Sequence, residues 1–134
     1  MMSDGVSIGV ASRESGVKVP TIRYYEQIGM LRAPPRTKSN RRLYGAVDLR
    51  RLAFIRHARE LGFGIVAIRA LLTLQDNPNQ SCKAADAIAR ARLGEVQQRI
   101  DGLTALKAEL ERMVAECSLG RVAECGVIGA LTTM

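Results

Sequence analysis

The sequence predicts a mainly α-helical chain, with a small winged helix-turn-helix domain followed by one long helix suited to coiled-coil pairing. Of the 134 residues, 47% are hydrophobic but only 4% are aromatic, so Leu, Ile, Val and Ala supply most of the apolar surface. That mix favours helices over a β-sandwich. Two short helical patterns lie near the N-terminus, and residues 83–116 contain no proline. The chain is long enough for one compact domain and one extended element.

The first two helices are expected over residues 7–16 and 20–26. Ser7 suits the N-cap of the first helix, because its hydroxyl can accept a backbone N–H of the first turn. Gly16 can end that helix, and Pro20 fits the first turn of the next one. Two short helices joined by a tight turn predict a helix-turn-helix.

Residues 31–44 are predicted to form a short β-hairpin, the wing. Pro34 and Pro35 exclude a helix there, and Ser39 with Asn40 offers turn chemistry. Two amphipathic helices are expected next, over residues 47–59 and 65–75. The residues expected to face the core are Leu52, Ile55, Leu61, Ile65, Ile68, Leu71 and Leu72.

The proline-free segment 83–116 predicts a coiled coil. Its apolar residues alternate by three and four positions over more than three heptads. They are Leu93, Val96, Ile100, Leu103, Leu110 and Val114, with Lys107 interrupting the stripe. One isolated helix cannot bury such a stripe, so we expect an antiparallel coiled-coil homodimer. Packing of the stripe on the N-terminal domain of the same chain is the alternative.

Charge divides the chain into two halves. Residues 1–80 hold 13 Lys and Arg against 6 Asp and Glu, whereas residues 81–134 hold 7 of each. The basic half predicts an anionic partner, double-stranded DNA. The expected DNA contacts are Lys18, Thr21, Arg23, Tyr24, Arg36, Lys38, Arg41, Arg42 and Tyr44. The second helix would enter the major groove, and the wing would follow the phosphates. For Tyr44 two roles stay open, packing in the core or a hydrogen bond to phosphate.

The residues Thr21-Ile22-Arg23-Tyr24-Tyr25-Glu26 resemble the MerR family of transcriptional regulators. The segments 28–31, 41–44, 48–55 and 61–71 resemble the parts of that family that follow. The resemblance spans essentially the whole chain. It implies a winged helix-turn-helix dimer, joined by antiparallel helices, that binds a palindromic operator inside a promoter with an overlong spacer. Effector binding would bend and underwind the DNA so that RNA polymerase can use both promoter elements.

The three cysteines, Cys82, Cys117 and Cys125, all lie in the charge-balanced half. Seven residues separate Cys117 from Cys125, which suits a loop that folds both thiolates onto one ion. Cys82 stands before the long helix, about 50 Å from its far end, so it cannot meet Cys117 in the same protomer. In an antiparallel dimer, Cys82 of the partner subunit completes the site, which gives two sites per dimer.

This placement resembles that of metal-sensing members of the family. Members that recognise monovalent copper, silver or gold have serine at the first position, so Cys82 implies a soft divalent metal ion at each site: Cd(II), Pb(II), Zn(II) or Hg(II). The loop lacks the histidine or further cysteine of many zinc-specific members, which favours cadmium, lead and mercury, although water or Glu124 can supply a fourth ligand. Three alternatives stay open: a monovalent sensor using Cys117 and Cys125, a thiol redox regulator, and cysteines that only fill the core.

Other functional classes are not supported. The sequence contains no recognisable catalytic grouping, so we expect no enzyme, and the roughly ten residues after Cys125 leave no room for a drug-binding domain. No signal sequence or apolar run of about 20 residues is present, so we expect a cytoplasmic protein with reduced thiols and no membrane partner. The expected domains are 1–78 for DNA binding, 79–116 for dimerisation, and 117–134 for the metal-binding loop, with a short helix and tail.

Overall fold

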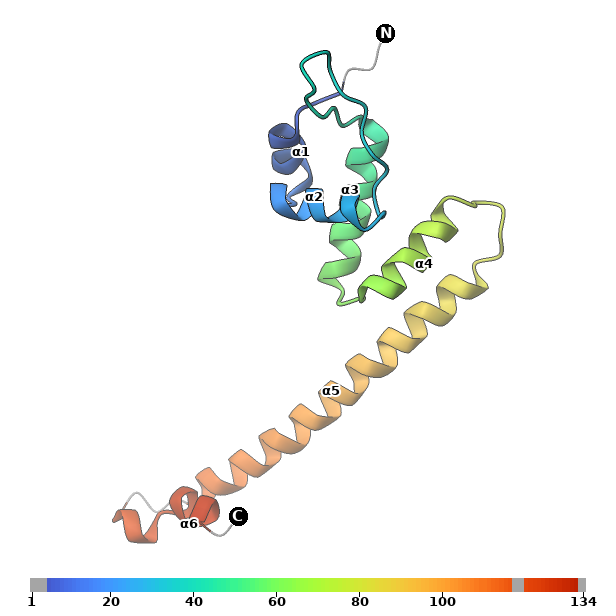
Figure 1. Ribbon diagram of the computed structural model, residues 1–134. Helices are drawn as coiled ribbons and strands as arrows, with labels where there is room; N and C mark the ends of the chain where they lie inside the picture. Colours follow the sequence, from blue (N-terminus) through green and yellow to red (C-terminus); the bar gives the residue numbers. More distant parts are fainter. Residues whose placement is uncertain (1–4, 117–119, 133–134) are drawn as a thin grey trace. The chain divides into compact units, whose positions relative to one another are not determined.

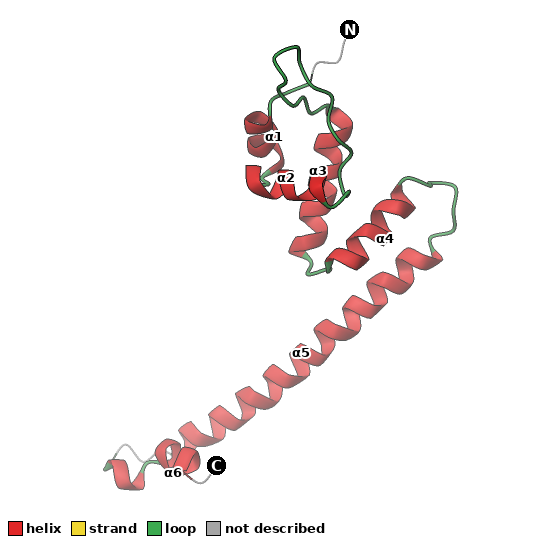
Figure 2. Cartoon of the chain, in the orientation of Figure 1, coloured by secondary structure: helices red, strands yellow, loops and turns green. Residues whose placement is uncertain are grey.

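The structure is a computed structural model that describes residues 5–116 and 120–132 (Figure 1). It divides into two compact units, Met1–Ile88 and Ala89–Met134. Among the described residues, helices and loops account for all of the chain (Figure 2), which confirms the mainly α prediction. The elements are α1 (Ile8–Ser15), α2 (Val19–Gln27), α3 (Ala46–Glu60), α4 (Ile65–Gln75), α5 (Lys83–Ala115), η1 (Val122–Glu124) and α6 (Gly126–Thr132).

Helices α1 and α2 form the predicted helix-turn-helix. The hydroxyl of Ser7 accepts the Val10 N–H at 3.3 Å and so caps α1. Gly16 ends the helix with φ +75°, a left-handed conformation that glycine adopts without strain. Pro20 lies in the first turn of α2. Gly16 and Pro20 therefore bound the turn between the two helices, as the sequence predicted.

The wing is a narrow hairpin. Arg36 and Arg42 form an antiparallel bridge, flanked by a 2.8 Å hydrogen bond from the Thr37 N–H to the Arg41 carbonyl. Asn40 closes the turn with φ +67°, a conformation that asparagine tolerates better than most residues. At the base of the wing, Tyr44 exchanges two backbone hydrogen bonds of 2.8 Å with Val6, which precedes α1.

One hydrophobic core holds the first unit together. It draws buried residues from α1, α2, the segment that follows α2, and helices α3 and α4. Its largest fully buried side chains are Ile22, Met30, Tyr44, Leu52, Ile55, Ile68 and Leu72. Helix α2 is thus anchored in the core by the buried side chain of Ile22, while its opposite face stays exposed.

The placement of Leu61 in the core was wrong, because this residue is 66% exposed. Leu61 is the C-cap of α3, and the chain turns immediately afterwards through Gly62, whose φ is +84°. Phe63 packs against the core instead. The turn carries the Leu61 side chain away from the face that α3 presents to the core.

Helix α5 is continuous over 33 residues, a length of about 50 Å at the rise of an α-helix. Its apolar stripe is largely uncovered in the single chain, with Leu93, Leu103 and Val114 each more than 60% exposed. Leu106, which the sequence interpretation left out of the stripe, is also 54% exposed. It lies with Leu103, Leu110 and Val114 along one shallow apolar groove.

Candidate nucleic-acid interface and metal centre

Helix α2 presents two distinct faces. Ile22 and Tyr25 are buried, at 0% and 4% exposure, whereas Arg23 is exposed and Tyr24 is 47% exposed. Thr21 is half-buried at the rim, and Lys18 is exposed at the N-cap of the helix. The polar face therefore carries every residue of α2 that was expected to contact DNA.

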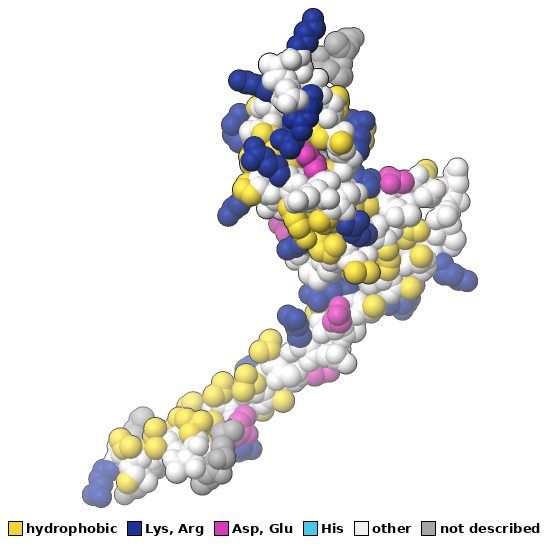
Figure 3. All heavy atoms as spheres, in the orientation of Figure 1, with side chains coloured by type: hydrophobic (Ala, Val, Ile, Leu, Met, Phe, Trp, Pro, Cys, Tyr) yellow, Lys and Arg dark blue, Asp and Glu magenta, His cyan; other side chains and the backbone are white. Residues whose placement is uncertain are grey.

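The wing adds exposed cations beside this face. Arg36, Lys38 and Arg41 are exposed, and the guanidinium of Arg36 donates to the Asn40 carbonyl at 3.1 Å, which braces the hairpin turn. Arg42 is more enclosed, with 28% of its side chain exposed, and pairs with Glu26 at 3.0 Å. Figure 3 shows Lys and Arg side chains gathered over the wing and the domain that bears it.

Tyr44 requires a correction. It is only 1% exposed, and its hydroxyl donates to a carboxylate oxygen of Glu26. Burial and this hydrogen bond raise the pKa of the Tyr44 phenol above its ordinary value, so the group stays protonated. Because the side chain is enclosed and its donor is already used, we remove Tyr44 from the expected DNA contacts and assign it to the base of the wing.

A second basic feature, which the sequence interpretation missed, adjoins the helix-turn-helix. An open groove is lined by Lys18 and Thr21 at the start of α2 and by Arg56, Arg59 and Glu60 from α3, with Glu60 paired to Arg56 at 3.6 Å. The Arg56 guanidinium lies against Gly16, where an added Cβ would be only 3.0 Å from its Nη1. The signal in the sequence was the spacing of three between the two arginines, which places them on one face of a helix.

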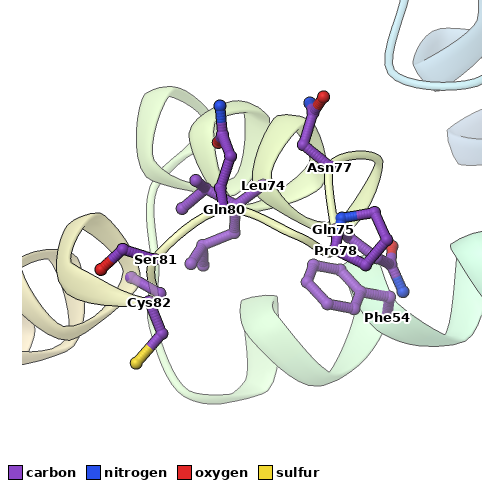
Figure 4. Close-up of a pocket in the computed structure, with 10 residues that line it drawn as sticks. Phe54, Leu74, Gln75, Asn77, Pro78, Gln80, Ser81 and Cys82 are labelled. Carbon is purple, nitrogen blue, oxygen red and sulfur yellow. The ribbon is translucent and has the colours of Figure 1, made fainter.

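Cys82 is exposed and directly precedes α5. Its carbonyl accepts the Asp86 N–H at 2.9 Å, which joins it to the first turn of the helix. It lies at the edge of an apolar cavity of about 380 Å³, lined also by Phe54, Leu74 and Pro78. Figure 4 shows the thiol directed away from Phe54 and Pro78, so the sulfur is available to a ligand from outside the cavity.

Cys125 is half-buried between η1 and α6. Its N–H donates to the Val122 carbonyl at 3.0 Å, and its carbonyl accepts the Gly129 N–H at 2.9 Å. The expected ligand Cys117 lies outside the described residues. Within the residues that the structure does describe, no three His, Cys, Asp or Glu side chains gather into a metal centre in the single chain.

The two residues that flank the segment 117–125 lie next to each other. A Cβ built at Gly126 would be 2.7 Å from the Cβ of Glu116 and 2.9 Å from its carbonyl carbon. Glu116 immediately precedes Cys117, and Gly126 immediately follows Cys125. Glu116 and Gly126 therefore lie at neighbouring points of the backbone, an approach that only glycine allows at position 126.

His57, the single histidine, is exposed on α3, and among the described residues it belongs to no group of three potential metal ligands. Among the described helices, none has the length and hydropathy needed to cross a bilayer.

A winged helix-turn-helix with an exposed basic recognition helix and wing defines a DNA-binding regulator. The chain belongs to the MerR family of helix-turn-helix transcriptional regulators, and it is not an enzyme. Residues 6–75 match the family described as MerR HTH family regulatory protein, and residues 49–113 match the family described as MerR, DNA binding. The family resemblance in the sequence is therefore confirmed.

The relatives of this chain include transcriptional regulators, and the names of some of them refer to heavy metals. The chain is 40% identical to the HTH-type transcriptional regulator ZntR of Escherichia coli K12, over 82% of this chain and 79% of ZntR. It is 34% identical to heavy metal-dependent transcription regulator 2 of Rhizobium meliloti, over 92% of this chain and 84% of that protein.

The fold is also similar to that of PbrR691 from Ralstonia metallidurans CH34, a transcription regulator solved in complex with lead(II). The TM-score is 0.79 and the sequence identity 35%, over 94% of this chain and 98% of PbrR691. These similarities place the chain with the metal-sensing branch of the family.

Proposed function

We propose that this chain is a metal-responsive transcriptional regulator that activates a metal-resistance or efflux promoter when a soft divalent ion binds. The observation that carries the proposal is the placement of the thiols at the two ends of α5. Cys82 precedes the first residue of that helix, and Cys117 and Cys125 follow its last residue in the sequence.

The dimer is proposed from the uncovered stripe on α5. Two such helices pairing antiparallel would bury the stripe of each against the other. The start of one helix then lies beside the end of its partner, so that Cys82 of one subunit meets the loop of the other. Residues 1–78 would bind DNA, 79–116 would pair, and 117–134 would hold the metal.

The residues present suit a thiophilic ion. Three thiolates around a divalent ion leave a net charge of −1, and soft sulfur ligands favour Cd(II), Pb(II) or Hg(II), with Zn(II) also accommodated. Because thiols must lose their protons to bind, metal affinity should rise with pH. One ion would bind per site and two per dimer, with water or Glu124 proposed as a further ligand.

The DNA contacts are proposed for the exposed polar face of α2 and for the wing. They comprise Lys18, Thr21, Arg23, Tyr24, Arg36, Lys38, Arg41 and Arg42. A two-fold dimer requires a palindromic operator. Metal binding would distort the promoter so that RNA polymerase can use it, a deformation that costs several kcal/mol and that backbone contacts would offset.

A second candidate is a sensor of monovalent copper, silver or gold that uses Cys117 and Cys125 alone. The close approach of Gly126 to Glu116 supports it, because these two residues flank the cysteine pair in the sequence and the contact does not involve Cys82. A thiol redox switch between the same two cysteines would use the same geometry. Cys82→Ser separates these readings from the three-thiolate site.

The test is transcription in vitro from the protein's own promoter, titrated with Cd(II), Pb(II), Zn(II), Hg(II) and Cu(I). We expect Cys82→Ser, Cys117→Ser and Cys125→Ser each to abolish activation by divalent metals while operator binding is retained. Gln80→Ala, an exposed change two residues before Cys82, is the control and should respond normally. A normal divalent response in all three cysteine variants would contradict the site, and a Cu(I) response that survives only in Cys82→Ser would favour the second candidate.

A further inference from the structure

Glu26 is an acidic side chain in the middle of the basic DNA-binding surface. It lies on α2, three residues after Arg23 and two after Tyr24, and only 10% of its side chain is exposed. We propose that Glu26 is a positioning residue that holds the wing against the recognition helix and raises the preference of the protein for its operator over other DNA. The inference rests on the DNA interface proposed above.

Both carboxylate oxygens of Glu26 are bound by residues of the wing. Oε1 accepts the Nε–H of Arg42 at 3.0 Å, and Oε2 accepts the hydroxyl of Tyr44. Hydrogen bonds to an ionised carboxylate are stronger than those between neutral groups. One side chain of α2 thus binds the hairpin at two points, through two hydrogen bonds.

Those two points connect to the rest of the domain. Arg42 is bridged to Arg36 across the hairpin, and Tyr44 exchanges backbone hydrogen bonds with Val6, just before α1. The contacts of Glu26 therefore link the recognition helix, the wing and the entry to α1. Because the recognition helix and the wing must contact the duplex together, a fixed spacing between them favours one register of the protein on DNA.

The charge of Glu26 also increases the preference for the operator over other DNA. Nonspecific binding depends mainly on neutralising phosphates, and a carboxylate among the arginines weakens that attraction for every sequence. Its pairing also occupies the Nε–H of Arg42, so that this donor is not free to bind phosphate. Glu26 therefore reduces affinity for DNA in general while it preserves the geometry that an operator requires.

The test compares a duplex selected in vitro by the wild-type dimer with a scrambled duplex of the same length and composition. Binding of the full-length dimer is followed by fluorescence anisotropy at several salt concentrations. For Glu26→Gln we expect tighter binding to the scrambled duplex, with a steeper salt dependence, and weaker binding to the selected one. Their affinity ratio should fall by about tenfold, the equivalent of removing one hydrogen bond to a charged group.

Two further variants separate charge from position. Glu14→Gln on α1 removes the same charge from an exposed site and should leave the ratio unchanged. Tyr44→Phe removes the hydroxyl that donates to Glu26 without changing any charge, so it should weaken operator binding while nonspecific binding and its salt dependence stay the same.

An unchanged affinity ratio in both Glu26→Gln and Tyr44→Phe would overturn the proposal, whether affinity is retained or lost equally on both duplexes. Thermal melting of each variant checks that the domain is folded. If the wild-type protein itself does not distinguish the two duplexes, the proposed DNA function fails, which is a different outcome from failure of the role of Glu26.

Discussion

Truncation of one leucine on α5 should strongly weaken dimerisation. Leu103 is 65% exposed in the single chain and lies in the apolar groove formed with Leu106, Leu110 and Val114. If α5 pairs with a second copy, Leu103→Ala removes most of one buried side chain from each subunit.

The magnitude follows from the exposed fraction. Full burial of a leucine side chain contributes about 1.5–3 kcal/mol, and about two thirds of that remains to be gained when the single chains pair. Each subunit then loses about 1–2 kcal/mol and the two-fold dimer about 2–4 kcal/mol, which raises the dimer dissociation constant by about 30- to 700-fold.

Sedimentation equilibrium over a range of protein concentrations measures this constant. Leu61→Ala is the matched control, because Leu61 is 66% exposed, almost the same as Leu103, but lies outside the stripe. The control should leave the dissociation constant unchanged. Equal constants for wild type and Leu103→Ala would refute pairing through α5.

Three further changes have defined outcomes. Arg41→Ala should reduce the slope of log affinity against log salt by about 0.9 for each phosphate that is no longer neutralised, and an unchanged slope in a salt titration would argue against the role of the wing in DNA binding. Asp48→Ala removes a 2% exposed carboxylate that accepts the Gly45 N–H at 2.9 Å at the start of α3. It should lower the free energy of unfolding by about 1–3 kcal/mol, measured by denaturant titration at fixed protein concentration, and a change near zero would contradict the cap. Gly126→Ala should push α6 off Glu116 and weaken metal binding by about tenfold. Gly129→Ala, where an added Cβ meets nothing within 4 Å, should leave metal binding unchanged. Equal affinities in a competitive metal titration would contradict the role of the contact between Gly126 and Glu116.

The helices could be predicted closely because their ends depend on local chemistry. Ser7 and Gly16 bound α1 as expected, and the predicted range of residues 65–75 matches α4. The predicted α2 is short by one residue at each end, since its Lys18 N-cap makes no side-chain hydrogen bond that could mark the start.

One error has a local cause, and the other concerns a residue whose partner is distant in the sequence. The amphipathic pattern placed Leu61 in the core, but the turn at Gly62 redirects it. Tyr44 was open to either role because its partner, Glu26, lies 18 residues away in the sequence. Nothing in the sequence pattern shows that an acid on α2 meets the base of the wing, so the link through Glu26 appeared only in the structure.

The metal centre could be proposed from the sequence because thiols are rare and their spacing is informative. The structure adds the close approach of Gly126 to Glu116 and the outward thiol of Cys82. The direction in which two chains pair is less well determined by the sequence. The stripe on α5 indicates a partner, but hydrophobic spacing alone does not specify the relative direction of two helices.

A mixed dimer tests the central claim, that each metal site is shared between two subunits. One subunit carries Cys82→Ser and the other Cys117→Ser, with different affinity tags so that the mixed species can be isolated. A shared site predicts one intact three-thiolate centre per mixed dimer, seen as one equivalent of Cd(II) with thiolate-to-metal absorption, whereas both parent homodimers have none. If the mixed dimer also binds no metal in this way, the ligands do not come from two chains and the account is wrong.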